Sequence, residues 1–112
     1  MQNRSFITDD EIDKALDFLR DNARDAAQAR AERVYVEEYR KTLKAQLMKE
    51  HDKLSAVLQE REAYSDERYQ QHLEAIREAV QRDEFHRFMR IAAEAKIDAW
   101  RTQSSNVRSA NV

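Results

Sequence analysis

Five aspartates at four-residue spacing form the most regular pattern of charged side chains in this sequence. They are Asp9, Asp13, Asp17, Asp21 and Asp25. A helix places such residues on one face, where each pair of like charges destabilises an isolated helix by about 0.2–0.5 kcal/mol. We favour a solvated face that nearby Lys and Arg side chains neutralise. The alternative is a docking strip for a basic partner, or a mimic of phosphate groups. Its central residues are Asp13, Asp17 and Asp21.

A second pattern mixes basic and aromatic side chains near the C-terminus. Residues 85–90 read FHRFMR, and the candidate cations around them are Arg82, Arg87, Arg90, Lys96 and Arg101. Cations neutralise phosphates and aromatic rings stack on bases, so this pattern allows weak nucleic-acid binding. We favour the other interpretation, in which Phe85, Phe88 and Met89 belong to the core and the cations pair with the N-terminal acids.

Metal and catalytic motifs are poorly represented. Carboxylate di-iron bundles need two Glu-x-x-His motifs, and the nearest match here is a single Asp83-x-x-His86. The other two histidines, His51 and His72, are far apart in the sequence. We therefore expect no catalytic residues, no metal site and no cofactor, and we predict that the protein is not an enzyme.

The composition narrows the class of protein. The 112 residues include no Gly, Pro or Cys, which excludes Gly-rich phosphate loops, disulfides and Cys zinc sites, and 38% of them are charged. A net charge of −2 is unusual for a dedicated nucleic-acid-binding domain. The longest apolar runs have three residues, so we expect no membrane segment. The first five residues are polar apart from Met1, so we expect no signal peptide and a cytoplasmic location.

The periodicity predicts an all-α fold of two long helices in a single domain over residues 1–112. Thr8 and Glu11 form a capping box that starts a helix over 9–50. Ser65 is the expected cap of a second helix over 66–102. We expect a connector or short helix over residues 52–64. Because the chain has no glycine, we expect a His or Asp after residue 50 to adopt the left-handed backbone conformation that ends a helix. Residues 1–7 and 104–112 are expected to be flexible.

Charge and side-chain size predict that the helices form an antiparallel hairpin that turns near residue 58. Acidic and basic blocks then lie opposite each other, and the alanines of residues 23–31 face large side chains near residue 88. The expected core stripes are Ile12, Leu16, Leu19, Ala23, Ala26; Val36, Tyr39, Leu43, Leu47; and Tyr69, Leu73, Ile76, Val80, Phe85, Phe88, Met89, Ala92, Ala99, Trp100. Because this seam is thin, we expect the hairpin to dimerise into a four-helix bundle.

Three stretches of the sequence resemble small all-helical proteins of tailed bacteriophages and prophages. They are residues 11–16 (EIDKAL), 31–41 (AERVYVEEYRK) and 99–104 (AWRTQS). The resemblance spans most of residues 9–108 and implies a role in the cytoplasm of an infected bacterium, as an accessory to phage DNA metabolism or host takeover. It assigns no site residue.

These observations predict a non-enzymatic helical protein that binds a phage or host protein and associates with itself. The alternative is an accessory factor in phage DNA metabolism that binds nucleic acid weakly through the basic and aromatic C-terminal helix.

Overall fold

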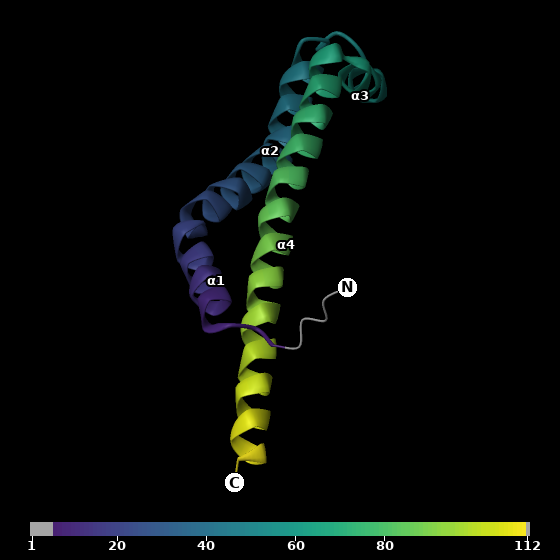
Figure 1. The fold of residues 1–112 in the computed structure, drawn as a ribbon. Coiled ribbons are helices and arrows are strands. Elements are labelled where there is room, and N and C mark those ends of the chain that lie inside the picture. The colour runs from purple at the N-terminus through teal and green to yellow at the C-terminus, as the bar shows by residue number, and fades with distance from the viewer. Residues whose placement is uncertain (1–5, 112) are drawn as a thin grey trace, which may run out of the picture. The chain divides into compact units, whose positions relative to one another are not determined.

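A computed structural model describes residues 6–111 and contains four α-helices in that range (Figure 1). They are α1 (Asp9–Asp21), α2 (Ala23–Lys49), α3 (Ala56–Ser65) and α4 (Glu67–Ala110). The all-α prediction is confirmed. Residues 1–5 and 112, which belong to the segments expected to be flexible, lie outside the described residues.

The chain forms two compact units. The terminal unit contains residues up to 26 and from 85 onward, and the central unit contains residues 27–84. Helices α2 and α4 contribute residues to both units. The prediction of one domain over residues 1–112 therefore stays a prediction.

Helices pair in antiparallel fashion inside each unit. In the central unit, Arg33 of α2 contacts Asp83 of α4, while Glu50, just after α2, contacts Arg68 near the start of α4. In the terminal unit, Trp100 of α4 donates a hydrogen bond from Nε1 to Asp9 Oδ1 at 3.3 Å. Within each unit, the predicted hairpin pairing is confirmed.

The predicted helix over residues 9–50 is interrupted at Asn22, so that prediction is wrong in one place. Asn22 donates both its backbone N–H and its side-chain Nδ2 to the Phe18 carbonyl oxygen, at 3.0 and 3.1 Å. Its own carbonyl accepts the first hydrogen bond of α2, from the Ala26 N–H. An Asn side chain competes with the helical backbone for hydrogen bonds, which ends α1 here.

The turn between the long helices is built by polar caps. The short third helix is confirmed as α3, and Ser55 caps it by accepting a hydrogen bond from the Leu58 N–H. The prediction that Ser65 caps the second long helix is wrong, because Ser65 is the last residue of α3. Asp66 takes that role, because its Oδ1 accepts from the Arg68 N–H at 2.8 Å. No described residue has a positive φ, so the predicted left-handed His or Asp is also wrong.

Helix α4 continues to Ala110, eight residues beyond the predicted end at 102. The Gln103 side chain explains part of this extension. It donates to the Ile7 carbonyl and accepts from the Ile7 N–H, both at 2.8 Å. Since residues 103–110 contain no Gly or Pro, each added residue also gains a backbone hydrogen bond at little cost. The prediction that residues 104–110 lie outside the helix is wrong.

The buried seam is smaller and more polar than predicted. Ile12, Val36, Leu47 and Tyr69 are buried as expected, and Leu47, Ala63 and Tyr69 form the core of the central unit. On α4 the seam mixes apolar side chains with small and polar ones, at steps of three or four residues and one step of seven: Tyr69, His72, Ile76, Ala79, Asp83, His86, Ala93, Ile97, Trp100 and Ser104. The predicted core residues Leu16, Leu73, Phe85, Phe88 and Met89 are exposed.

Candidate interaction surface

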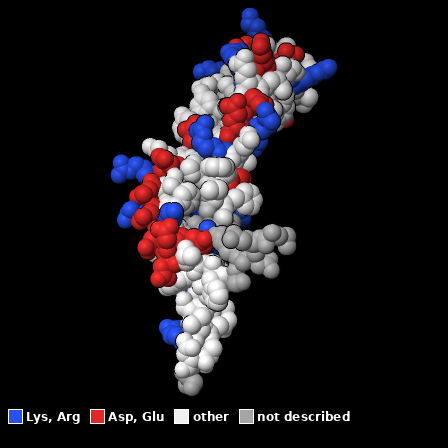
Figure 2. Space-filling view, in the orientation of Figure 1, with Lys and Arg blue, Asp and Glu red and all other residues white. Residues whose placement is uncertain are grey.

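The acidic strip lies on the surface of the terminal unit. Asp13, Asp17 and Asp21 are exposed on α1, and Figure 2 shows acidic side chains gathered over this helix. Arg20 contacts Asp21 at 3.0 Å and Asp17 at 3.3 Å. Its hydrogen bond to Asp21, followed by the attraction of both carboxylates, raises the pKa of the Arg20 guanidinium. Part of the strip is thus neutralised from within its own helix, as the solvated interpretation requires.

The candidate cations of the terminal unit also find partners on their own helix. Arg90 lies 3.8 Å from Glu94, and Arg101 lies 3.5 Å from Asp98. Lys96 lines a groove described below. Arg82 belongs to the central unit, where it lines a shallow hollow with Ala29, Glu32 and Tyr35. The structure does not show these five cations, including Arg87, gathered at one site.

Two large aromatic side chains stand outside the seam. Phe85 is 61% exposed and Phe88 is 60% exposed, so the prediction that they fill the core is wrong. The Arg87 guanidinium lies 5.5 Å from the centre of the Phe88 ring, within the range of a cation–π contact. Because His86 and Ala93 turn toward the seam instead, the phenylalanines face solvent.

A groove runs beside α4 in the terminal unit. Its volume is about 760 Å³, and its lining includes Phe6, Ile7, Ala99, Val107 and Ala110. A smaller hollow of about 290 Å³ between α1 and α4 has Ala15, Phe18, Met89 and Ala92 in its lining. Glu11 and Lys96 line both. The terminal unit therefore has two hollows beside α4 that share charged lining residues.

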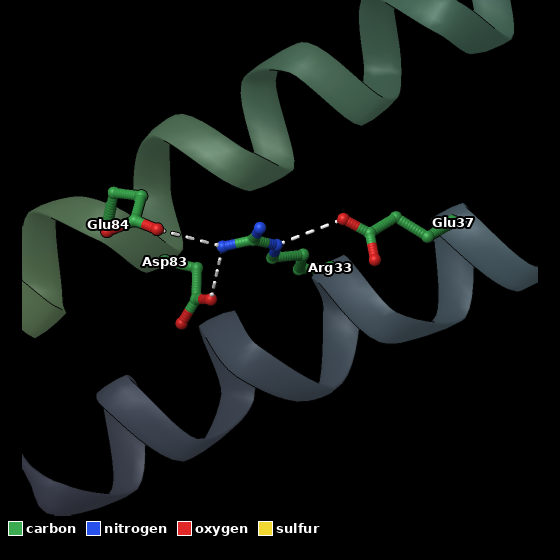
Figure 3. A network of polar contacts seen from close by, with 4 residues as sticks. All are labelled: Arg33, Glu37, Asp83 and Glu84. Carbon is green, nitrogen blue, oxygen red and sulfur yellow. Dashed lines mark hydrogen bonds and ion pairs between the residues drawn. The ribbon is translucent and has the colours of Figure 1, made fainter.

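The central unit contains a polar cluster that the sequence analysis missed. Arg33 donates from Nε to Glu37 at 3.0 Å, and from Nη1 to Asp83 at 3.1 Å and to Glu84 at 3.2 Å (Figure 3). Asp83 is only 8% exposed. Hydrogen bonds to Glu37, Glu84 and Asp83, in that order, raise the pKa of the Arg33 guanidinium. The seam spacing Tyr69, Ile76, Asp83, seven residues at each step, could have indicated that Asp83 faces α2.

A second polar contact joins the same two helices. His72 Nε2 lies 2.6 Å from the Val36 carbonyl oxygen and donates to it. The His72 ring also tilts against Tyr39, with 5.5 Å between ring centres. These bonds satisfy a polar side chain in the seam, and they serve packing.

The turn holds a third cluster, centred on Arg68. Its Nη2 lies 2.9 Å from both Glu50 and Asp66. These hydrogen bonds lower the pKa of the Glu50 and Asp66 carboxyls. Nearby, the Lys44 ammonium lies 4.7 Å from the Tyr64 ring centre and 3.6 Å from Glu60. Both clusters tie the ends of α2, α3 and α4 together, which is a structural role.

Two further observations concern chemistry that the sequence did not favour. Within residues 6–111, no three His, Asp or Glu side chains are arranged so that they could hold a metal ion. Among the helices of that range, none has the length and apolar composition that crossing a bilayer requires.

Comparison with known proteins identifies no relative. No family model, no curated protein and no solved structure matches the chain.

Proposed function

We propose that this protein is a non-enzymatic helical adaptor or accessory protein that binds a protein partner through apolar side chains on its surface. The observation that supports this function is the placement of its large apolar residues. Tyr35 is 64% exposed and Phe85 is 61% exposed, while alanines and polar residues occupy much of the seam. Apolar surface of this kind is typical of interaction sites, because leaving it in water costs about 25 cal/mol per Å².

The exposed apolar residues are not confined to one element. On α2 they include Val34 and Tyr35, on α3 Val57 and Leu58, and on α4 Phe85, Phe88, Met89 and Ile91. Single exposed apolar residues are common in soluble proteins. Several in each unit, on a chain with 38% charged residues, are better explained by contacts with other molecules.

The resemblance to helical phage proteins supports a phage or prophage origin and a partner of phage or host origin in a bacterial cytoplasm.

Capture from bacterial cells that express the tagged full-length chain tests this function. We expect a partner that the wild-type protein captures at a fixed stoichiometry, and at least about tenfold weaker capture by Tyr35→Glu or Phe85→Glu. Ala75→Glu is the matched control, because Ala75 is an exposed small residue on α4. Capture that neither apolar-to-Glu change weakens, at unchanged helix content, would contradict the proposal.

One observation also favours nucleic-acid binding as a second function. Phe88 is exposed with the Arg87 guanidinium over its ring, and Lys96 and Arg101 are exposed on the same helix. Such residues could stack on bases and contact phosphates. This function predicts micromolar binding to a 20-nucleotide single strand in 20 mM salt, lost in Phe88→Ala and weakened steeply by salt. No change in fluorescence anisotropy at 100 μM protein would exclude it.

A further inference from the structure

The outward face of α4 in the terminal unit carries a second apolar stripe, which we call the outer stripe. Its residues follow 3-4 spacing and are all exposed: Phe85, Phe88, Ala92, Ala95, Ala99 and Thr102. This is the 3.5-residue period with which helices pack against one another in coiled coils. The N-terminal end of the stripe is large, and the rest is small.

The outer stripe and the seam lie on different faces of α4. In the same stretch the seam residues are His86, Ala93, Ile97 and Trp100, each buried or half-buried. At about 100° per residue, the mean directions of the two sets differ by roughly 140° around the helix axis. Ala92 also lines the hollow between α1 and α4, and Ala99 lines the groove beside Phe6 and Ile7. A partner helix on the outer stripe would therefore cover the edges of these hollows and leave the buried contacts of the seam in place.

We infer that the outer stripe binds the outer stripe of a second copy of this chain, with the two α4 helices antiparallel. A two-fold axis between Ala92 and Ala95 places Ala92 of one copy against Ala95 of the other. The same register places Phe88 against Ala99 and Phe85 against Thr102. This deeper statement rests on the proposed function, because it names the partner of one of the exposed surfaces.

Self-complementarity is the reason to choose a second copy over another protein. In a two-fold interface, residue i contacts j and j contacts i. Every layer of this register then sets a large side chain against a small one, or two alanines against each other, as close helix packing requires. The flanking positions bring Lys96 opposite Met89 and Asp98 opposite Ile91, so no like charges oppose one another there.

The available area is sufficient for a specific dimer. A phenylalanine side chain can bury about 150–250 Å², so four phenylalanines that are each about 60% exposed can bury roughly 500 Å². The alanines, Met89 and Ile91 bring the total to the order of 1,000 Å², the lower limit for a specific interface.

Exchanging the large and small members of one layer tests the register. Phe88→Ala leaves two alanines opposed, and Ala99→Phe opposes two phenylalanines, so each should raise the dimer dissociation constant at least about tenfold. The double variant restores one Phe and one Ala in each layer and should return the constant to within about threefold of wild type. Sedimentation equilibrium of the full chain measures this constant, and circular dichroism confirms that each variant is folded.

Disulfide trapping tests the axis independently, since the natural chain has no cysteine. A mixture of Ala92→Cys and Ala95→Cys chains, distinguished by mass, should form the mixed disulfide in preference to either homodimer under mild oxidation. Ala75→Cys, on an exposed part of α4 outside the outer stripe, is the matched control and should form little of any dimer.

Each outcome decides between this inference and the broader proposal. A strictly monomeric chain at 100 μM, or a double variant no better than its singles, overturns the second-copy inference. If that monomer still captures a different protein through Phe85 or Tyr35, the adaptor function stands. If it instead binds single-stranded DNA through Phe88, the outer stripe belongs to a nucleic acid and both proposals for this surface fail.

Discussion

Arg33 and Asp83 place an ion pair where the sequence pattern calls for apolar residues. Replacing Arg33 alone would leave the Asp83 charge in a poorly hydrated position, because Asp83 is 8% exposed. A polar contact in a helical seam can also fix register, since only one alignment of the helices satisfies it. We therefore expect Arg33 both to favour one alignment of α2 and α4 and to stabilise the fold by pairing with Asp83.

This role predicts a sharp difference between two arginines of α2. Arg33→Met should lower the melting temperature by roughly 5–10 °C, because it removes the cation that Asp83 faces. Arg30→Met is the control, since Arg30 is exposed, and should change it by less than about 2 °C. Adding Asp83→Leu to Arg33→Met should recover most of the loss. Equal effects at the two arginines would show that the ion pair is dispensable.

At the scale of the elements, local signals were predictable and seam residues were not. Thr8 caps α1 as its capping box predicts, by accepting a hydrogen bond from the Glu11 N–H at 3.2 Å. The break at Asn22 had a local signal too, since Asn competes for backbone hydrogen bonds. The predicted seam is wrong where it takes the largest apolar residues of α4, Phe85 and Phe88, as buried. The seven-residue spacing on α4 places Asp83 in the seam, but the partners of Asp83 and His72 lie on α2, so the sequence of α4 alone does not identify them.

The C-terminal part of α4 owes its order in part to Gln103. Gln103→Ala removes both hydrogen bonds to Ile7, and each is worth about 1 kcal/mol. We expect the Ile7 amide to exchange its hydrogen about tenfold faster in this variant. Gln81→Ala, an exposed change on the same helix, should leave that exchange rate unchanged. Unchanged protection of Ile7 in Gln103→Ala would mean that packing alone holds this segment.

The turn between α2 and α4 should respond to acid through Arg68. The lowered pKa values of Glu50 and Asp66 mean that these carboxylates stabilise the fold above their ordinary pKa near 4. That contribution is lost as pH falls through the lowered values. The melting temperature of Arg68→Gln should therefore fall below wild type at pH 7, and the gap should close as the pH falls below the ordinary pKa near 4 and through the lowered values. Arg61→Gln, an exposed change on α3, should show no such gap at either pH.

At the scale of the whole molecule, the balance between buried and exposed apolar groups governs behaviour. Of the larger side chains in the described residues, Ile12, Val36, Leu47 and Tyr69 are buried, whereas fourteen large apolar side chains are exposed. Small cores stabilise short chains poorly, and association supplies the missing burial. In the dimer that we infer, folding and self-association are linked, because a partner that binds only the folded state stabilises it by mass action.

That linkage predicts a melting temperature that depends on protein concentration. For the wild-type chain, raising the concentration from 5 to 500 μM should raise the melting temperature by roughly 5–10 °C, because RT ln 100 is about 2.7 kcal/mol. Ala95→Lys places a charged side chain in each of the two layers beside the two-fold axis, where each lysine opposes Ala92 of the other copy. It should make the melting temperature independent of concentration and close to the low-concentration value of wild type. Ala75→Lys should retain the wild-type dependence, since Ala75 lies outside the outer stripe. A concentration dependence that survives Ala95→Lys would locate the self-association on another surface of the chain.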